Sequence, residues 1–348
     1  MKLSDFNYNL PPELIALQPV LPKDTAKMLV LDHNSSIKDR YINSLVDFLN
    51  SGDLIIFNNT KVIPAKLTGY KIDSKFIINI NLHKHIKDSL WSAFAKPTKK
   101  LDVGECLLIG NQIVKIMDKL LDGQIIFDFG MGKRTFEEFI NQYGQTPLPS
   151  YIEKRYSTSK LDKSFYQTMF AKYSGSVAAP TAGLHFTPEL MSTLSAKGIN
   201  HAFITLHVGG GTFLPVKTDN IYEHKMHSEF ATLCPYTADL INLTKKNGKR
   251  IITVGTTSTR VLEAAADSNG LVKSFSSEVD LFIVPGYKFK VIDMVLTNFH
   301  LPKSTLLMLV AAFTGYNEIF TAYNHAIKYG YRFYSYGDCC LLYNKGST

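Results

Sequence analysis

The sequence is poor in cysteine and in long apolar runs. Its four cysteines are too few and too scattered for a framework of disulfide bridges: Cys106, Cys234, Cys339 and Cys340. The adjacent Cys339 and Cys340 would point to opposite faces of a strand, so they are not expected to bind a metal together. The longest unbroken apolar run is Leu306–Phe313, far shorter than the roughly 18 residues that span a bilayer.

The first residues also lack a secretory signal. Asp5 and Glu13 interrupt the apolar residues there, and no basic start precedes an apolar core. No internal repeat and no low-complexity tract is evident. These absences predict a reduced, cytoplasmic protein that does not enter a membrane.

The composition is that of a globular protein. The 348 residues are 45% hydrophobic and 20% charged, which excludes a disordered chain, a collagen-like fibre and a small disulfide scaffold. At about 150 residues per domain, this length favours two domains.

Positive charge is concentrated in two stretches. The net charge is +8, and residues 61–100 hold nine lysines against Asp73 and Asp88. The second stretch, residues 151–173, interleaves tyrosines with basic residues that include Lys154, Arg155 and Lys160. This mixture suits a polyanion with bases to stack on, although a solvated lysine-rich face explains the charge equally simply.

The C-terminal half alternates helix and strand patterns. Thr187-Pro188-Glu189 predicts a helix start that runs to about Gly198. Strands are expected at residues 201–208, 250–254, 281–284, 291–297 and 331–336, and helices at 237–247, 255–266, 304–313 and 317–328. Alternation of this kind predicts an α/β layer or barrel with active loops at the carboxyl ends of its strands.

The region of residues 62–130 has a different pattern. Short β-rich pieces are separated by Gly, Asp and Lys with no clear helix between them, which predicts a small all-β barrel or sandwich. We therefore expect an α/β unit of residues 1–61 and 150–348, interrupted by an inserted β-barrel of residues 62–149.

Several of the ten histidines stand beside Gly, Thr or Pro at expected strand ends. These are His185, His207 and His300. Imidazoles that converge on one pocket can move protons near neutral pH, although each histidine taken alone is as well explained by a structural role. His224 and His227 are three residues apart, without the spacing of a helical zinc site, and no metal is expected.

Two glycine- or threonine-rich turns follow expected strands. Residues 209–212 and 255–258 expose N–H groups and hydroxyls that suit a carboxylate or a ribose, or they are simply tight turns. Neither matches a dinucleotide fingerprint or a Walker loop. Asn58 and Asn59 follow a buried-looking strand, where their amides either fix a purine edge or stabilise a turn.

Taken together, these segments closely resemble the S-adenosylmethionine:tRNA ribosyltransferase-isomerase family of queuosine biosynthesis. The resemblance runs from Asp5 to about Leu342. It is carried by the segments 57–65, 175–187, 204–216, 255–260, 280–286, 296–309 and 331–338.

The resemblance implies an α/β-barrel-like large domain with a β-barrel insert. It also implies transfer and isomerisation of the ribosyl unit of S-adenosylmethionine onto 7-aminomethyl-7-deazaguanine at the tRNA wobble position. Epoxyqueuosine-tRNA forms, adenine and methionine leave, and S-adenosylmethionine is a substrate, so no cofactor is expected. A monomer is expected.

The candidate site residues follow from these motifs. The catalytic candidates are His185, His207, His227, Glu229 and His300, without a division of roles. The candidates for substrate binding are Asn58, Asn59, Thr181, Gly209, Gly210, Thr256, Thr257, Arg260 and Asn298. The candidates for tRNA binding are Lys154, Arg155 and Lys160.

The sequence departs from the family pattern in three places. Residues 23–27 carry Lys23 and Lys27 where the family usually has arginines, which removes a bidentate fork. Gly210 stands where Ala is more usual, and Cys339-Cys340 replaces a small and an apolar residue. None of these changes removes a candidate catalytic group.

Two other functions are compatible with parts of the sequence. A non-catalytic RNA-binding protein would explain the basic insert, but not the clustered His and Thr. A methyltransferase would also use S-adenosylmethionine, but the expected strand and glycine-rich turn near the N-terminus is missing.

Overall fold

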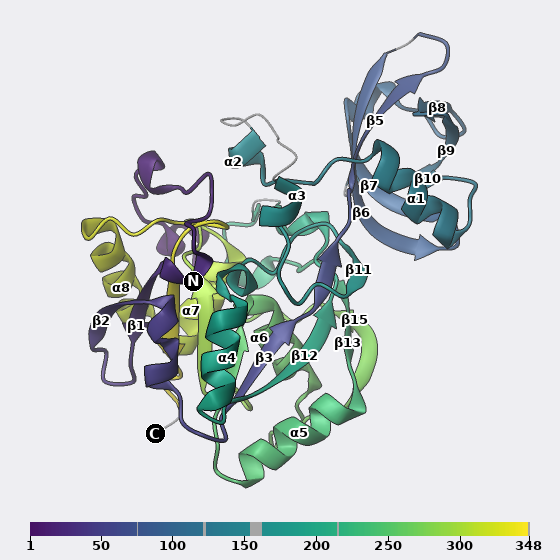
Figure 1. Cartoon of the computed structure of the whole chain (residues 1–348). Coiled ribbons are helices and arrows are strands. Elements are labelled where there is room, and N and C mark those ends of the chain that lie inside the picture. Colours follow the sequence, from purple (N-terminus) through teal and green to yellow (C-terminus); the bar gives the residue numbers. More distant parts are fainter. Residues whose placement is uncertain (75, 121–122, 154–161, 214–215, 347–348) are drawn as a thin grey trace.

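The computed structural model describes residues 1–74, 76–120, 123–153, 162–213 and 216–346. A nine-stranded sheet forms the centre of its larger unit (Figure 1). In sheet order the strands are β15 (Phe275–Val279), β13 (Glu229–Leu233), β12 (Asn200–Leu206), β3 (Leu54–Asn58), β14 (Ile251–Val254), β16 (Met294–Asn298), β17 (Cys339–Tyr343), β1 (Lys27–Leu31) and β2 (Ile37–Tyr41).

The four strands at the middle of this sheet, β12, β3, β14 and β16, are parallel. Such strands are buried on both faces and read as continuous apolar runs: β3 has the sequence LIIFN, with every residue buried. Their carboxyl ends share one edge, and the loops that follow them line the site described below.

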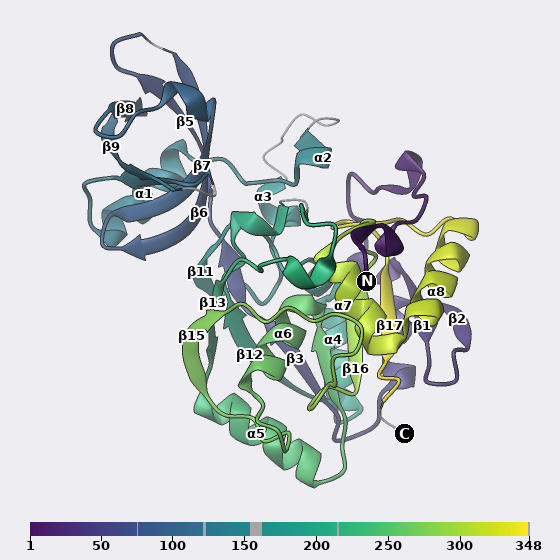
Figure 2. The same cartoon turned by 180° about the vertical axis from the view of Figure 1, so that it is seen from behind.

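Helices cover both faces of the sheet (Figure 2). On one face, Leu54 and Ile56 pack in a core with α5 (Pro235–Lys246), α6 (Gly255–Ala265), α7 (Thr305–Thr314) and α8 (Tyr316–Lys328). On the other, Ile55 and Phe57 pack with α4 (Pro188–Ala196) and the 3-10 helix η4 (Ile42–Phe48). This alternation follows from the two-residue period of a strand.

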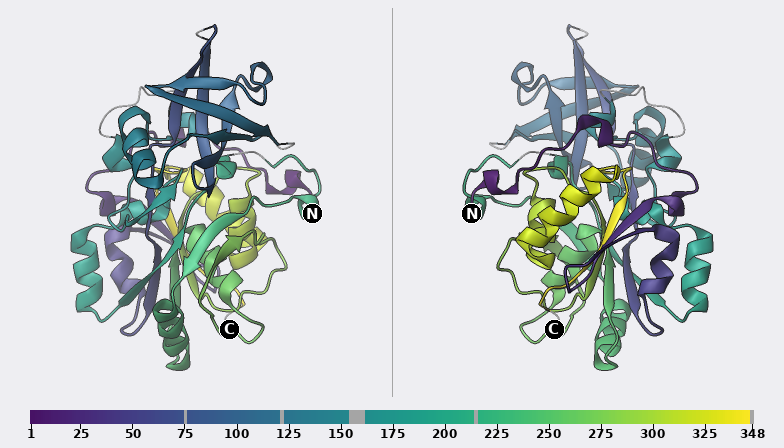
Figure 3. Two further views of the ribbon diagram at one scale, coloured as in Figure 1. Left: turned by 90° about the vertical axis from the view of Figure 1, so that its right-hand side faces the viewer. Right: turned by 90° about the vertical axis from the view of Figure 1, so that its left-hand side faces the viewer.

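The inserted unit is a closed six-stranded barrel. In barrel order its strands are β10 (Ile125–Asp128), β7 (Leu90–Lys96), β6 (Ile77–Lys87), β5 (Lys66–Lys71), β8 (Cys106–Ile109) and β9 (Gln112–Lys119). The helix α1 (Lys133–Tyr143) packs its aromatic face on this barrel, with Phe136 stacked on Trp91. Figure 3 shows the barrel beyond one end of the large unit, which carries both chain ends.

The chain passes between the two units through a short parallel pair, β4 (Thr60–Val62) and β11 (Tyr173–Ser176). After the barrel come the short helices α2 (Ser150–Glu153) and α3 (Asp162–Phe165). The residue boundaries of the two units, 62 and 149, stay a prediction.

The expected α/β class and the β-barrel insert are confirmed. Over the described residues the nine-stranded sheet stays open, because its outer strands β15 and β2 do not pair with each other. The helix start at Thr187 is also confirmed, since its hydroxyl accepts the N–H of Leu190. Cys339 and Cys340 lie in the cores on opposite faces of the sheet, as expected of adjacent strand residues.

Two expected strands are wrong. Residues 281–284 form an irregular segment whose Leu281 carbonyl accepts a hydrogen bond from Arg260 instead of a strand partner. Residues 331–336 also form a loop: Tyr334 has a φ of 76°, and Asp338 folds back to accept the Arg332 N–H. The last strand of the sheet follows this loop, as β17.

Candidate active site

A small cavity of about 110 Å³ lies at the carboxyl ends of β14 and β16, with both apolar and polar residues in its wall. Loops that follow these strands, the start of α6 and the 3-10 helix η6 (Thr181–His185) surround it. Seven of the residues expected in the site line this cavity: Thr181, Glu229, Thr256, Thr257, Arg260, Asn298 and His300.

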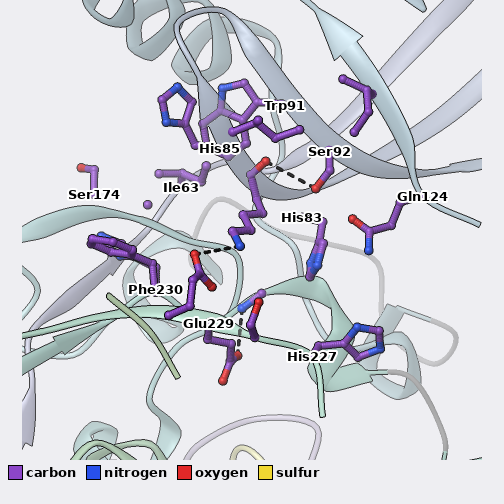
Figure 4. A pocket seen from close by; sticks show the side chains of 18 of the residues that line it. Ile63, His83, His85, Trp91, Ser92, Gln124, Ser174, His227, Glu229 and Phe230 are labelled. Atoms are coloured by element: carbon purple, nitrogen blue, oxygen red, sulfur yellow. Dashed lines mark hydrogen bonds and ion pairs between the residues drawn. The ribbon is translucent and has the colours of Figure 1, made fainter. Parts of the chain in front are cut away.

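A larger cavity of about 930 Å³ lies between the barrel and the sheet (Figure 4). His207, Gly209 and His227 line it from the large unit, whereas His83 and Gln124 line it from the barrel. Glu229 lines both cavities. The carboxylate of Glu229 therefore lies where the two cavities adjoin.

Glu229 is held by a buried ion pair. One carboxylate oxygen accepts the Arg260 Nη1–H at 2.6 Å, and the other accepts the Gly209 N–H at 3.1 Å. Both side chains are 6% exposed. Arg260 also donates to the carbonyls of Val279 and Leu281, so its guanidinium fixes β13 and the segment after β15 around Glu229.

His300 is a buried, neutral imidazole in the wall of the small cavity. Burial lowers its pKa to about 3. Its Nε2 lies 3.1 Å from the Thr297 hydroxyl, and its backbone is held by Tyr323 and Tyr8. At neutral pH this imidazole is uncharged, so it can form hydrogen bonds but does not act as an imidazolium acid.

His185 lies behind the cavity wall and contacts Asn298. The Asn298 amide nitrogen lies 3.2 Å from His185 Nε2, while its oxygen accepts the Thr181 hydroxyl at 2.8 Å. Burial lowers the pKa of His185 to about 4, with Arg332 and Lys23 adding repulsion. His185 lines neither of these two cavities and instead orients Asn298.

The larger cavity contains two of the expected histidines. His207 Nδ1 lies 2.7 Å from the Thr60 hydroxyl, and burial lowers the pKa of His207. A β-carbon on Gly175 would lie 3.0 Å from the His207 ring, and one on Gly211 would lie 2.7 Å from the His227 ring. Glycine is needed at these positions because each imidazole is packed directly on the backbone.

Asn58, Asn59 and Gly210 are close to the site without lining either cavity. Asn58 bonds both backbone groups of Leu206, and the Asn59 oxygen accepts the Thr205 hydroxyl at 2.7 Å. Both amides thus stabilise the turn after β3. A β-carbon on Gly210 would have no neighbour closer than 3.6 Å, so alanine fits there as well as glycine.

Thr256 and Thr257 lie in the first turn of α6, with both side chains at the small cavity. The first N–H groups of a helix have no partner within the helix and favour an anion. The threonine hydroxyls add further donors, so this end of the cavity suits a carboxylate.

The three tRNA-binding candidates lie outside the described residues: Lys154, Arg155 and Lys160. Of the two lysines that replace family arginines, Lys27 donates to the Tyr329 carbonyl at 3.0 Å. A single ammonium can make that contact, so no fork is required. Burial lowers the pKa of Lys23.

Sequence reasoning missed two sets of site residues. The barrel contributes His83, Lys84 and Gln124 to the larger cavity, and α1 contributes Lys133; none of them belongs to the histidine, glycine or asparagine motifs named above. The loop before β17 contributes Tyr334 and Ser335 to the small cavity. The positive φ of Tyr334, unusual for a bulky residue and frequent at functional sites, has no signal in the sequence.

Two features are absent from the described part of the chain. It contains no group of three or more His, Cys, Asp and Glu side chains arranged to hold a metal ion. No single helix in it is long and apolar enough to cross a membrane; α7 and α8 reach that length only together, and they are bent by 114° at their junction.

Comparisons with known proteins agree with this picture. The model of a family described as queuosine biosynthesis protein matches residues 3–342. S-adenosylmethionine:tRNA ribosyltransferase-isomerase of Rickettsia bellii is 48% identical over 99% of this chain and 100% of its own length. The Caulobacter vibrioides protein of that name is 44% identical over 99% of both chains.

A solved structure is similar as well. The crystal structure of S-adenosylmethionine tRNA ribosyltransferase from Thermotoga maritima matches with a TM-score of 0.56 and 34% identity, covering 97% of this chain and 99% of that one. The chain therefore belongs to the queuosine biosynthesis family of S-adenosylmethionine:tRNA ribosyltransferase-isomerases.

Proposed function

We propose that this enzyme transfers and isomerises the ribosyl unit of S-adenosylmethionine onto 7-aminomethyl-7-deazaguanine at the wobble position of tRNA. Epoxyqueuosine-tRNA, adenine and methionine are the products. The observation that supports this most directly is the position of Glu229, which lines both a small cavity and a large cleft. Two substrates of unequal size would meet at this carboxylate.

The sizes of the cavities suggest how the substrates divide between them. Pockets for drug-sized ligands measure about 300–1,000 Å³, so the cavity of about 110 Å³ holds only one end of S-adenosylmethionine. The methionine carboxylate would lie at the first turn of α6, by Thr256 and Thr257. The larger cleft would take the rest of that substrate and the wobble base.

The chemistry requires three proton transfers. The sulfonium acidifies the adjacent ribose carbon, adenine takes up a proton as it leaves, and the attacking amine gives one up. A positioned group typically accelerates such a step by about 10²–10⁴-fold. Glu229 lies at the junction as a proton acceptor, and His207 and His227 lie in the cleft where the amine would enter.

His300 and Asn298 have a binding role in this proposal. With its pKa lowered to about 3, His300 stays neutral; its Nε2 is bonded to the Thr297 hydroxyl, so Nδ1 is the ring nitrogen that would bond the substrate. Asn298 offers its amide, which Thr181 and His185 hold in one orientation. Arg260 acts by holding Glu229, since its guanidinium already binds that carboxylate and two carbonyls.

The partners are S-adenosylmethionine and a tRNA whose wobble base is the aminomethyl-deazaguanine. S-adenosylmethionine enters as a substrate, and no cofactor is part of the proposal. The protein is proposed to act as a monomer in the cytoplasm.

One incubation tests this function. Labelled S-adenosylmethionine is mixed with tRNA that carries the deazaguanine, and the small products are separated. We expect free adenine and methionine in equal amounts. S-adenosylhomocysteine would indicate methyl transfer instead, and tRNA binding without turnover would indicate a binding protein.

A matched pair of variants ties the activity to the site. Glu229→Gln should lower adenine release by at least about 10²-fold because it removes the proposed acceptor. Asp239→Asn, on the exposed face of α5, should leave it unchanged. Equal turnover of the two variants would remove Glu229 from the proton transfers.

A further inference from the structure

His83 is a buried barrel residue that packs on the large unit at the cleft. It lies on β6 and is buried, and its ring faces the turn that follows β12 (Figure 4). A β-carbon built on Gly209 would lie 2.7 Å from Cε1 of His83. The imidazole is thus in direct contact with the backbone of Gly209, with no room for a side chain between them.

The contact continues from Gly209 into the small cavity. The Gly209 N–H donates to Glu229 Oε1 at 3.1 Å, and Glu229 Oε2 accepts from Arg260 at 2.6 Å. Both Glu229 and Arg260 line the small cavity. A chain of contacts therefore connects the barrel to the cavity assigned above to one end of S-adenosylmethionine. It runs through His83, Gly209, Glu229 and Arg260.

A second contact between the units lies nearby but cannot set the position of the turn. Lys84 and Glu278 form an ion pair at 2.8 Å, with side chains 35% and 41% exposed. Exposed pairs of this kind contribute little to stability. The buried ring of His83 packs on the turn from the barrel, while Ser176 and Val177 of the large unit hydrogen-bond Val208 at its start.

We propose that His83 is a positioning residue of the reaction: by packing on Gly209 it sets the Glu229–Arg260 pair, so that the small cavity is completed only when the barrel is seated on the glycine turn. The inference rests on the proposed function for the identity of the substrate. It adds that occupancy of the cleft, which His83 also lines, and the geometry at Glu229 are coupled through one backbone segment.

Two glycines without a positive φ offer a matched pair of variants. Gly209→Ala places a methyl group against the His83 ring, whereas Gly132→Ala, at the start of α1, places one in open space with no atom within 4 Å. Neither glycine has a positive φ, so the two substitutions differ in contact and not in backbone strain. His83→Ala removes the ring, and the double variant Gly209→Ala/His83→Ala removes the collision.

We expect Gly209→Ala and His83→Ala each to lower kcat for adenine release at least about tenfold, because small displacements at a reacting centre are costly. Gly132→Ala should stay within about twofold of wild type. The melting temperature and the KM for both substrates are measured on each protein. For His83→Ala, a fall in kcat with an unchanged melting temperature is what a positioning role predicts and a purely structural role does not.

The double variant decides whether the two residues act through each other. Because removal of the ring relieves the collision, its kcat and melting temperature should exceed those of Gly209→Ala alone. Additive losses, or wild-type kcat in His83→Ala, would overturn the proposal. If wild-type enzyme released no adenine, the proposed function would fail, and the melting temperatures of the same four variants would still decide whether His83 and Gly209 are coupled.

Discussion

At the scale of single residues, charge state separates the candidate groups of this site. His185 and His300 are buried and neutral, with pKa values lowered to about 4 and about 3. Glu229 and Arg260 are buried as an ion pair. The sequence placed all four in the site, but burial cannot be read from it, and burial decides which of them can carry a proton.

The two buried histidines predict a loss of stability in mild acid. An unfolded histidine has a pKa near 6.5, so below that pH the unfolded chain binds protons that the folded one excludes. The contribution of the two neutral histidines to stability is complete above about pH 6.5. It is lost as the pH falls towards 4, the pKa of His185, and then 3, the pKa of His300. The free energy of unfolding should drop by about 1.4 kcal/mol per pH unit for each histidine, as measured by denaturant unfolding between pH 7 and pH 4.

Substitutions test whether His185 and His300 cause this dependence of the unfolding free energy on pH. His185→Gln and His300→Gln should each reduce the slope of the unfolding free energy against pH by the equivalent of about one proton, since glutamine does not titrate. His33→Gln serves as the control because His33 is exposed. A slope that stays the same in both buried variants would show that other groups cause the acid loss.

The Glu229–Arg260 ion pair predicts that substitutions of its two residues have non-additive effects on the free energy of unfolding. Removing one partner leaves a buried charge uncompensated, at a cost of about 3–5 kcal/mol. Glu229→Gln and Arg260→Met should therefore each destabilise the fold strongly, and the double variant should cost less than the sum. A double-mutant cycle by chemical denaturation measures this; an additive result would mean that the two side chains do not interact.

At the scale of elements, regular patterns were predictable and loops held by side chains were not. The helix at Thr187 and the long helices of the C-terminal half follow from caps and apolar spacing. The expected strands at residues 281–284 and 331–336 are loops because distant side chains, Arg260 and Asp338, take up their backbone groups. Local sequence carries no record of such long-range hydrogen bonds.

The end of α1 predicts a sharp steric effect in the barrel. A β-carbon on Gly144 would collide with the Pro64 carbonyl oxygen and lie 2.5 Å from that of Ile140. Gly144→Ala should lower the free energy of unfolding by about 2–3 kcal/mol. Gly132 lies at the start of the same helix, and a β-carbon there would have no atom within 4 Å. Gly132→Ala should therefore lower the free energy of unfolding by only a few tenths of that amount. Equal melting temperatures for the two variants would contradict this packing.

At the scale of the whole molecule, the insertion of a barrel into an α/β unit could be predicted from the change in pattern near residue 62. The cleft between the units could not, because it depends on how two separately folded surfaces meet. His83 is the clearest case: its position on β6 gives no hint that it packs on a turn more than a hundred residues away.

The positive charge of the chain predicts where tRNA binds and how the binding depends on salt. We expect the basic stretches of residues 61–100 and 154–172 to form one face for the anticodon stem-loop. Neutralising Lys154, Arg155 and Lys160 together should weaken tRNA binding and reduce its salt dependence, by about 0.9 in log–log slope for each lost duplex phosphate contact. Binding of S-adenosylmethionine should not change. Unchanged tRNA affinity and slope, measured by titration at several salt concentrations, would place the docking face elsewhere.

The strand order has a consequence for synthesis of the chain. The hydrophobic strand β1 is made early, yet one of its two neighbours is β17, the last strand of the sequence. Until β17 has left the ribosome, β1 and its partner β2 have no place in the sheet, and Met28–Leu31 present an unpaired apolar edge. Exposed edges of this kind promote aggregation during folding. We therefore expect the nascent chain to need protection of β1 until residues 339–343 have been made.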